Sequence, residues 1–337
     1  MALVSVVIPA YNAETYVKAA VESALRQTHT NVEVVVVDDG SADGTRDVLA
    51  SVSDKRLRVV HQPNSGVALA RNSGIEIGRG PFVAFLDADD VWLPTKLARQ
   101  LAALEANPSW VAVGAFMHHI SSSGRIVAMA GQPVGDRERE QVRRARLMPF
   151  PVSSLLVKRR VLDRTGLFDP EFAKLGQVED LDFLSRIAAQ GDIGCVKDVL
   201  GGYRVHGASA SARQFRLQRA GARYLAARHA ARDRGVELDF GNFMASRRWW
   251  ERVVTLRRDV AAFCYRSSGI AIADRRFFEA VMWALPAAAL GPLRVAERLR
   301  RQRGLRYRRS RARSIAGIES AAASAASTRA RQEAARH

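Results

Sequence analysis

The 337-residue chain has few cysteines and no long uninterrupted apolar run. Only Cys195 and Cys264 could form a disulfide, which excludes a cysteine-rich secreted domain and favours a reduced, cytoplasmic protein. The apolar start, residues 1–9, has no basic leader and no small-residue cleavage site, so it predicts a first strand rather than a signal peptide. The most apolar stretch, residues 277–293, contains Glu279 and is shorter than the ~20 residues that cross a bilayer.

Three glycine-rich nucleotide-binding motifs are also absent. No Gly-x-x-x-x-Gly-Lys-Ser/Thr loop occurs, which excludes a P-loop NTPase. The turn after the first apolar run is Pro9-Ala10-Tyr11-Asn12 rather than Gly-x-Gly-x-x-Gly, which excludes a dinucleotide-dependent dehydrogenase. The same turn lacks the Gly-rich loop with Arg or Lys that is typical of sugar nucleotidyltransferases.

Lysine is absent from residues 213–337, which hold 28 arginines against 10 acidic residues. Residues 1–212 carry equal numbers of basic and acidic side chains, so the whole net charge of +18 lies in the C-terminal part. This asymmetry predicts a polyanionic neighbour, either nucleic acid or an anionic membrane surface. The apolar stretch 277–293 among these arginines fits a helix in the membrane interface, and it fits equally a helix packed on the main domain. No nucleic-acid-binding motif is recognisable, so the sequence disfavours nucleic acid as a partner.

Strand and helix patterns alternate along the first 106 residues. Apolar, β-branched runs predict buried strands at 4–8, 32–37, 57–61 and 82–86. Helices are expected between them: one capped by Asn12 with its apolar face at 17–25, then 43–52, 66–77 and 94–106. Repeated β-α-β units predict a doubly wound, mainly parallel, Rossmann-like sheet with flanking helices. Further elements are expected at 111–117, 126–129, 136–147, 181–190 and 193–206, the last as two extended pieces broken at Gly201-Gly202.

A change in composition near residue 212 predicts the domain organisation. Residues 1–212 would form the α/β domain, and residues 213–317 a basic helical extension that would lie at a membrane interface in one of the two interpretations above. The Ala-, Ser- and Arg-rich residues 318–337 are expected to be a disordered tail.

Acidic residues follow two of the predicted strands. Asp38-Asp39 comes after the second strand, and Asp87-Ala88-Asp89-Asp90 comes after the fourth. Ligands of open α/β sheets bind beyond the carboxyl ends of the strands. Three acids within four residues repel one another unless a cation lies among them, and carboxylate oxygens favour Mg²⁺ or Mn²⁺ shared with substrate phosphates. A lone acidic turn would be a solvated surface feature, but this position favours a metal site.

Six short motifs occur in the order and spacing of one enzyme family. They are Ser5-Val6-Val7-Ile8-Pro9-Ala10-Tyr11-Asn12, Val37-Asp38-Asp39-Gly40-Ser41-Ala42-Asp43-Gly44-Thr45, Gln62-Pro63-Asn64-Ser65-Gly66-Val67-Ala68 with Ala70-Arg71-Asn72, Phe85-Leu86-Asp87-Ala88-Asp89-Asp90, Glu179-Asp180, and Tyr203-Arg204-Val205-His206. The chain thereby resembles the family 2 glycosyltransferases over about residues 1–212. The resemblance implies the GT-A fold and an inverting sugar transfer.

The resemblance implies a site for a nucleotide-sugar donor. Pro9, Tyr11 and Asn12 would line the nucleoside pocket, Asp39 would accept a hydrogen bond from the base, and Arg71 would hold a donor phosphate. A loop aromatic and a surface arginine are the plain structural alternatives for Tyr11 and Arg71.

The same resemblance assigns the acidic run to the donor and its metal. Asp87 and Ala88 would contact the nucleotide sugar, while Asp87, Asp89 and Asp90 would hold Mn²⁺ or Mg²⁺ against the diphosphate. His206 is a further candidate ligand for the metal or the phosphate, with a structural histidine as the alternative.

Asp180 is the residue that the resemblance implies as general base. It would deprotonate the acceptor hydroxyl, which attacks the anomeric carbon from the face opposite the leaving group. Asp180 also opens the helix expected at 181–190, where a helix dipole favours an ionised carboxylate, so an acid that only caps the helix is the alternative. Asp182 is a competing candidate for the same role.

The function expected is transfer of a sugar from a nucleotide-diphosphate sugar, with a UDP-sugar favoured, to a hydroxyl of a glycan or lipid-linked acceptor. Synthesis of a cell-envelope polysaccharide or glycolipid, at the inner face of the cell membrane or in the cytoplasm, would suit a basic C-terminal region. The alternative is a protein that binds nucleic acid or membrane and retains a non-catalytic nucleotide-sugar-binding domain. Donor base, sugar and acceptor are not readable from the sequence.

Overall fold

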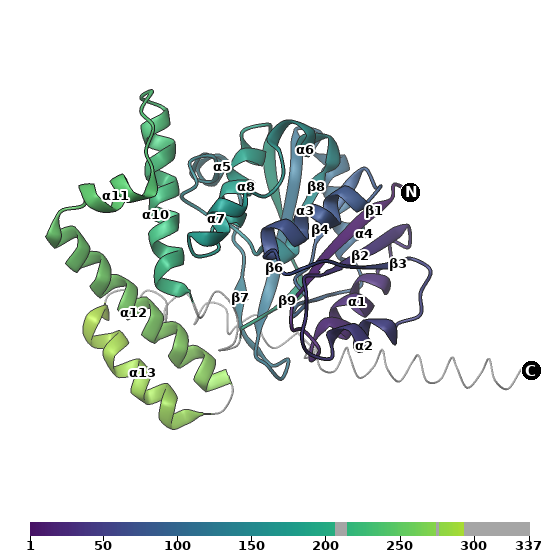
Figure 1. The fold of residues 1–337 in the computed structure, drawn as a ribbon, viewed down its shortest axis with the longest axis horizontal. Coiled ribbons are helices and arrows are strands. Elements are labelled where there is room, and N and C mark those ends of the chain that lie inside the picture. Colours follow the sequence, from purple (N-terminus) through teal and green to yellow (C-terminus); the bar gives the residue numbers. More distant parts are fainter. Residues whose placement is uncertain (206–213, 274–275, 293–337) are drawn as a thin grey trace, which may run out of the picture. The chain divides into compact units, whose positions relative to one another are not determined.

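A computed structural model describes residues 1–205, 214–273 and 276–292 (Figure 1). His206 and the predicted tail 318–337 lie outside the described residues. The chain separates into two compact units. Of the described residues, the larger comprises 1–118, 130–203 and 214–253, and the smaller comprises 119–129, 204–205, 254–273 and 276–292. All candidate site residues that the structure describes lie within the larger unit.

One half of the central sheet is parallel, as the sequence predicts. Four strands lie in the order β3-β2-β1-β4 and pair in parallel. Their bounds are β1 Val4–Ala10, β2 Val32–Asp38, β3 Leu57–His61 and β4 Phe82–Phe85. The chain runs outward from β1 to β3 and returns to β4 on the other side of β1, so the order of strands reverses between β1 and β4. Open α/β sheets bind their ligands beyond the carboxyl ends of the strands at such a reversal.

The other half of the sheet is built from antiparallel pairs, which the sequence pattern did not reveal. β8 pairs antiparallel with both β4 and β6, and β5 pairs antiparallel with β9. These strands continue the order as β4-β8-β6-β9-β5, and β7 pairs with β6. Their bounds are β5 Val91–Trp92, β6 Trp110–Ile120, β7 Ile126–Ala130, β8 Leu156–Lys158 and β9 Asp192–Arg204.

Helices cover both faces of the sheet (Figure 1). Those of the larger unit begin with α1 Val17–Leu25, α2 Thr45–Ala50, α3 Val67–Ile77, α4 Lys96–Ala106 and α5 Asp136–Arg143. They continue with the short 3-10 turn Val152–Ser154, α6 Arg159–Thr165, α7 Pro170–Lys174, α8 Glu179–Ala188, α10 Phe215–Arg232 and α11 Phe240–Ser246.

Two apolar cores result from the alternation of side chains along β1. Val4, Val6 and Ile8 pack in one cluster with α1 and α4, while Val7 packs in the other with α3, α5, α6 and α8. A strand that is buried on both faces is mainly apolar, which is why β1 lacks a polar/apolar alternation and has only Ser5 as a polar member. The sheet therefore lies between two layers of helices. The edge at which its parallel strands end is left for the site.

Two local predictions are wrong. Asn12 does not cap α1, which begins at Val17, because the Asn12 side-chain oxygen accepts a hydrogen bond from the Ala42 backbone N–H at 2.8 Å. Strand β9 is not broken at Gly201-Gly202 but continues through both glycines. A Cβ at Gly201 would lie 2.7 Å from the Val91 carbonyl oxygen, so the glycine permits the close pairing of β9 with β5.

The smaller unit contains two helices that pack against each other. Most of α12 (Trp249–Ala273) and all of α13 (Phe277–Leu290) belong to it. The apolar stretch 277–293 is therefore helical through residue 290. Within the described residues, no helix is both long enough and apolar enough to cross a membrane.

Candidate active site

The carboxyl ends of the parallel strands carry the acidic motifs. Tyr11 directly follows β1, Asp39 follows β2 and Asp87 lies two residues past β4. Because the three strands are parallel neighbours, their carboxyl ends lie at one edge of the sheet. The sequence-predicted donor residues are thereby brought to the same edge.

Arg71 joins three carboxylates that come from distant parts of the chain. Its Nη2 donates to Asp87 Oδ1 at 2.8 Å, and its Nη1 donates to Asp180 Oδ1 at 2.5 Å and to Glu179 Oε1 at 3.3 Å. Arg71 lies on α3, Asp87 follows β4, and Glu179 and Asp180 open α8. We refer to these four residues as the Arg71 cluster.

The Arg71 cluster holds more negative than positive charge. Arg71 and Glu179 are almost fully buried, whereas the side chains of Asp87 and Asp180 remain about a quarter exposed. Burial, together with the neighbouring Glu179 and Asp87 and against the opposing attraction of Arg71, raises the pKa of Asp180 to about 7. The three carboxylates raise the pKa of Arg71, although its burial acts in the opposite direction.

Asp180 is poised to exchange a proton near neutral pH. One of its oxygens, Oδ1, is held by Arg71, and no donor among the described residues is bound to the other, Oδ2. A partly exposed carboxylate with a pKa near 7 is suited to general base catalysis, because about half of it is ionised at neutral pH and that form is basic enough to take a proton. Glu179 is buried behind it, and no partner for its Oε2 is found in the described part of the chain.

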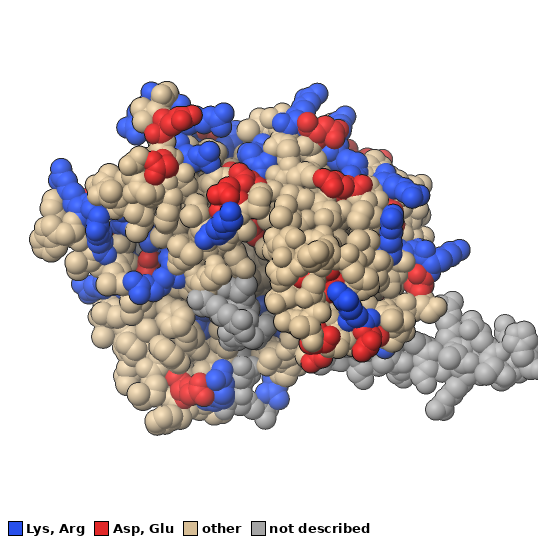
Figure 2. Space-filling view, in the orientation of Figure 1, with Lys and Arg blue, Asp and Glu red and all other residues tan. Residues whose placement is uncertain are grey.

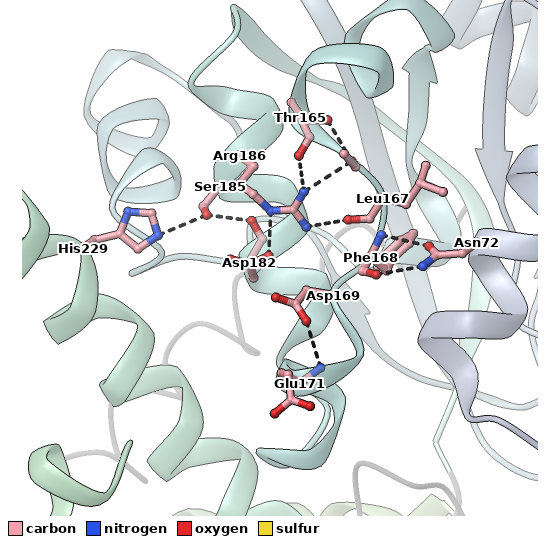
Figure 3. A network of polar contacts seen from close by, with 11 residues as sticks. Asn72, Thr165, Leu167, Phe168, Asp169, Glu171, Asp182, Ser185, Arg186 and His229 are labelled. Carbon is pink, nitrogen blue, oxygen red and sulfur yellow. Dashed lines mark hydrogen bonds and ion pairs between the residues drawn. The ribbon is translucent and has the colours of Figure 1, made fainter. Parts of the chain in front are cut away.

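Arg186 holds helix α8, which carries Asp180 in its first turn, to the chain around residues 165–167 (Figure 3). Arg186 donates to Asp182 Oδ2 at 2.7 Å and to the backbone oxygens of Thr165 and Leu167 at 2.6 and 2.8 Å. Asp182 is thus an ion-pair partner within its own helix and has no bond to the Arg71 cluster. This geometry favours Asp180 over Asp182 as the base.

The loop before α7 is tied to α3 next to Arg71. Asn72 makes two hydrogen bonds with the backbone of Phe168, donating to its oxygen at 2.8 Å and accepting from its N–H at 2.9 Å (Figure 3). The Phe168 ring stacks on Phe183 of α8 and lies 5.2 Å from the Arg71 guanidinium carbon. Asn72 and Phe168 therefore join α3 and α8 at the position where Arg71 binds Asp180.

Asp39 is buried and organises the loop before α3. Its Oδ1 accepts hydrogen bonds from the Gln62 side chain at 2.8 Å and the Ser65 N–H at 2.9 Å, and its Oδ2 accepts from the Gly66 N–H at 2.8 Å. A carboxylate has about four acceptor positions, so three are used and about one remains for a ligand N–H.

Asp38 has a structural role that the sequence did not predict. It is fully buried, and its Oδ2 is bound by Arg46 at 2.8 Å and by His61 Nδ1 at 2.9 Å. These bonds and that of Ser41 lower the pKa of Asp38 to about 2 against the opposing effect of burial. Asp38 therefore ties β2 to α2 and β3 beneath the site.

The loop after β1 combines a buried and an exposed part. Pro9 lies within β1 opposite Val37, whereas Tyr11 is 53% exposed. Asn12 adopts a left-handed backbone conformation with φ of 48° and bonds through its N–H to the Ser41 hydroxyl at 3.0 Å. The exposed Tyr11 ring is free to stack or pack on a ligand, and Asn12 holds the loop that carries it.

Ser153, a residue that sequence reasoning missed, anchors the acidic run at its first residue and again two residues after its last. The Asp87 N–H donates to the Ser153 hydroxyl at 3.1 Å, and the Trp92 indole N–H donates to the Ser153 carbonyl at 2.7 Å. Between these anchors Ala88 and Asp90 are buried, and Asp89 is half-buried. No motif marks Ser153, because its role depends on the antiparallel half of the sheet.

Among the described residues, no group of three or more His, Cys, Asp or Glu side chains is arranged as metal ligands. Asp87 has one oxygen on Arg71, and Asp90 is fully buried. Only Asp87 and Asp89 of the predicted ligands are therefore both described and partly exposed.

Comparison with known proteins identifies the family. The family model described as glycosyl transferase family 2 matches residues 5–166. An Escherichia coli protein named UDP-Glc:alpha-D-GlcNAc-diphosphoundecaprenol beta-1,3-glucosyltransferase WfaP is 30% identical over 218 residues, which are 64% of this chain and 82% of that protein. The chain belongs to glycosyltransferase family 2.

Other relatives of this family 2 member match over a smaller share of their length. An uncharacterized glycosyltransferase of Nostoc is 34% identical over 61% of this chain and 66% of its own length. The Bacillus subtilis protein named putative teichuronic acid biosynthesis glycosyltransferase TuaG is 49% identical over 29% of this chain and 40% of its own. The chain thus spans less than two thirds of the length of both proteins.

Solved structures confirm the GT-A fold of the transferase. Staphylococcus aureus TarS 1–349 in complex with UDP-GlcNAc matches with a TM-score of 0.53 and 19% identity over 84% of this chain and 90% of that chain. The Pyrobaculum calidifontis mannosyltransferase PcManGT, in complex with GDP-Man and Mn²⁺, matches with a TM-score of 0.50 and 22% identity over 90% and 79% of the two chains. At these identities the similarity establishes the fold of the family 2 domain and nothing finer.

The last of the six motifs, at residues 203–206, has a structural contact in its described part. Arg204 is buried and donates to the carbonyl oxygens of Ser121 and Ser122, both at 3.0 Å. It therefore holds the turn between β6 and β7. His206, which the sequence suggested as a ligand, lies outside the described residues.

Proposed function

We propose that this family 2 glycosyltransferase moves a sugar from a nucleotide-diphosphate sugar to an acceptor hydroxyl with inversion at the anomeric carbon, and that Asp180 is its general base. The observation that carries the proposal is the Arg71 cluster at the carboxyl edge of the sheet. It presents a partly exposed Asp180 with a pKa of about 7 beside Asp87, the first residue of the acidic run.

The proposed reaction is a single displacement. Asp180 Oδ2 takes the proton of the acceptor hydroxyl while that oxygen forms a bond to the anomeric carbon. The bond between the anomeric carbon and the diphosphate oxygen breaks on the opposite face, and the nucleoside diphosphate departs. Arg71, which the family resemblance assigns to a donor phosphate, is proposed instead to position Asp180 and Asp87, because both of its terminal nitrogens are bonded to carboxylates.

The donor is proposed to lie over the ends of β1 and β2. Tyr11 would pack against the nucleoside beside Pro9 and Asn12, and Asp39 would accept the N–H of the base at its remaining acceptor position. A UDP-sugar is the proposed donor, supported by the TarS complex with UDP-GlcNAc and by the UDP-Glc in the printed name of WfaP.

A divalent cation is proposed to accompany the donor. The residues fit Mn²⁺ or Mg²⁺ in two respects: their donors are carboxylate oxygens, and three carboxylates in the Arg71 cluster face one guanidinium. Asp87 and Asp89 would hold the ion, with the buried Asp90 supporting their turn and Ala88 against the donor. Such an ion offsets the charge of the leaving diphosphate when it is bound. Few protein ligands suffice, because these ions commonly share their coordination with substrate phosphates.

The acceptor is proposed to be a sugar linked through diphosphate to a polyprenyl lipid. The names of WfaP and of its Escherichia coli counterpart WfgD, which is 41% identical over 106 residues, both specify a diphosphoundecaprenol-linked acceptor. Such an acceptor would place the reaction in cell-envelope polysaccharide synthesis, with the enzyme peripheral at the inner face of the cell membrane.

The proposal is tested with the full chain, a panel of nucleotide sugars and a short-chain GlcNAc-diphosphate lipid, with Mn²⁺, Mg²⁺ or EDTA. We expect release of nucleoside diphosphate that depends on acceptor and metal, and a product whose anomeric configuration is opposite to that of the donor. Retention of configuration would refute the single displacement.

Variants separate the donor and base functions. Asp89→Asn should abolish metal-dependent donor binding measured by calorimetry. Asp163→Asn, on the exposed part of α6, is the matched control and should bind donor normally. Unchanged donor binding by Asp89→Asn, or transfer that is insensitive to EDTA, would contradict the proposed metal site.

A further inference from the structure

Helix α13 has two apolar faces, of which only one is covered by the residues that the structure describes. On the inner side its Ala280 carbonyl accepts a hydrogen bond from the Ser268 hydroxyl of α12 at 2.9 Å. Trp283 on the same side meets Phe263 of α12 edge to face, with ring centroids 5.6 Å apart. The Leu290 carbonyl, at the end of α13, accepts a hydrogen bond from Arg257 at 3.0 Å. These contacts show which side of α13 is buried within its own unit.

The opposite face carries a continuous row of large exposed apolar side chains. We call this row the α13 outer face, and its members are Phe277, Phe278, Val281, Met282 and Leu285. Their exposed fractions range from 56% for Met282 to 80% for Phe278. At 100° per residue these five positions fall within an arc of about 140° on the helix.

The α13 outer face contains no charged side chain. The other exposed residues within the same arc are alanines, and the ion pair of Arg276 with Glu279 stands at the start of the helix. In the space-filling view the surface over α13 is almost entirely uncharged (Figure 2). Single exposed apolar residues are ordinary, but adjacent bulky ones without interspersed charge mark a surface that is covered by another phase or another molecule.

The charge of the residues that follow α13 indicates what covers the α13 outer face. The twenty residues 294–313, which follow α13 in the chain, contain ten arginines and one glutamate. An apolar helix face followed by dense positive charge combines the two forces that hold a protein on an anionic lipid surface, namely apolar insertion and electrostatic attraction. Nucleic acid would use the arginines but would give the apolar face nothing to contact, because it is bound mainly through phosphates.

We propose that the α13 outer face is a membrane-docking surface that inserts into the headgroup region of an anionic bilayer. Helix α13 would lie in the plane of the interface and would not span the bilayer, consistent with its 14 residues and with the absence of a spanning helix among the described residues. This surface goes beyond the proposed transfer reaction, since binding to lipid requires neither donor nor acceptor.

The test compares two valine-to-aspartate variants of nearly equal exposure. Val281 on the α13 outer face is 57% exposed, and Val236, after α10, is 54% exposed. Sedimentation of the full chain with vesicles of phosphatidylglycerol and phosphatidylcholine, without any acceptor lipid, should show binding that falls with salt. Val281→Asp should reduce the partition constant by at least about tenfold, because burial of one valine side chain already corresponds to that factor. Val236→Asp should bind as the unaltered protein does.

The alternatives give different results. If Val281→Asp binds vesicles as well as Val236→Asp does, the surface does not insert and the proposal fails. If the unaltered protein ignores vesicles but forms a dimer that Val281→Asp dissociates in analytical ultracentrifugation, the occupant is a second copy. If the unaltered protein binds DNA but not vesicles, the arginines bind nucleic acid and the membrane proposal fails. Transfer to a short-chain acceptor in vesicle-free solution should be unchanged by Val281→Asp, which separates this proposal from that of the catalytic function.

Discussion

Replacement of Asp180 by asparagine tests the proposed chemistry most directly. The structure predicts that the change leaves the cluster assembled, because an asparagine oxygen can still accept the 2.5 Å hydrogen bond from Arg71 Nη1. Asp87 and Glu179 would continue to balance the guanidinium charge. What is lost is the ability of the second oxygen to take a proton, since an amide nitrogen does not act as a base.

The expected loss in kcat for Asp180→Asn is about 10²- to 10⁴-fold, the range for removal of a general base. Donor binding measured by calorimetry should be unchanged, because the donor is proposed to contact the strand ends rather than Asp180. The unaltered enzyme should show kcat/KM rising with pH up to about 7, where Asp180 loses its proton, and falling about tenfold per pH unit below it. The residual activity of the variant should lack this dependence.

Stability provides a second readout with a defined sign. The pKa of Asp180 is raised from its ordinary 3.8 to about 7, so the folded state binds this proton more tightly than the unfolded state does. The Asp180 carboxyl therefore makes the protein less stable as pH rises from about 4 to 7. The Asp180→Asn variant should lack this loss of stability between pH 4 and 7. At pH 8 it should therefore melt at the same temperature as the unaltered protein or at a higher one.

Asp182→Asn is the matched control on the same helix. Its amide oxygen can still accept the 2.7 Å hydrogen bond from Arg186, so the variant should stay folded and keep kcat within a few-fold. Asp180 is not the general base if Asp180→Asn keeps more than a tenth of the activity, or if Asp182→Asn loses activity while Asp180→Asn does not.

Three further predictions concern the frame of the site. Arg71→Met leaves three carboxylates without their cation and should lower the free energy of unfolding by about 3–5 kcal/mol in urea melts, more than Arg26→Met at the exposed end of α1. Asp38→Asn should be less stable than the unaltered protein at pH 7. The unaltered protein should lose stability as pH falls from about 4 toward the Asp38 pKa of about 2, and the variant should lack this loss. Identical thermal melts of the two proteins across this range would contradict the assigned ion pairs. Gly201→Ala should destabilise by about 1–3 kcal/mol through collision with the Val91 carbonyl, whereas Gly269→Ala in α12, which meets nothing within 4 Å, should stabilise by about 0.5–1 kcal/mol.

The first half of the fold was readable because its signals are local. β1, β2 and β4 are mainly apolar runs and β3 has the apolar centre Val59-Val60. Helical patterns with turn residues separate these strands, so the parallel order followed from β-α-β connectivity alone. The antiparallel half was not readable. β5 and β8 are only two and three residues long, and β9 passes through two glycines that look like a break. Whether a glycine interrupts a strand or admits a neighbour depends on the contact it makes, and that contact is with Val91.

By itself, the sequence determined the chemistry available to this protein: the carboxylates after β2 and β4, the Glu179-Asp180 pair, the family to which their spacing belongs, and a basic C-terminal region. Only the tertiary structure decided how these residues are connected. It brings Arg71 against Asp87, Glu179 and Asp180 across 16, 108 and 109 positions of the chain, and it turns Asp182 away to Arg186. The physical reason is that hydrogen bonds and charge interactions act over a few ångströms. Residues distant in the chain acquire a role, such as the raised pKa of Asp180, only when packing of α3, β4 and α8 places them within that distance.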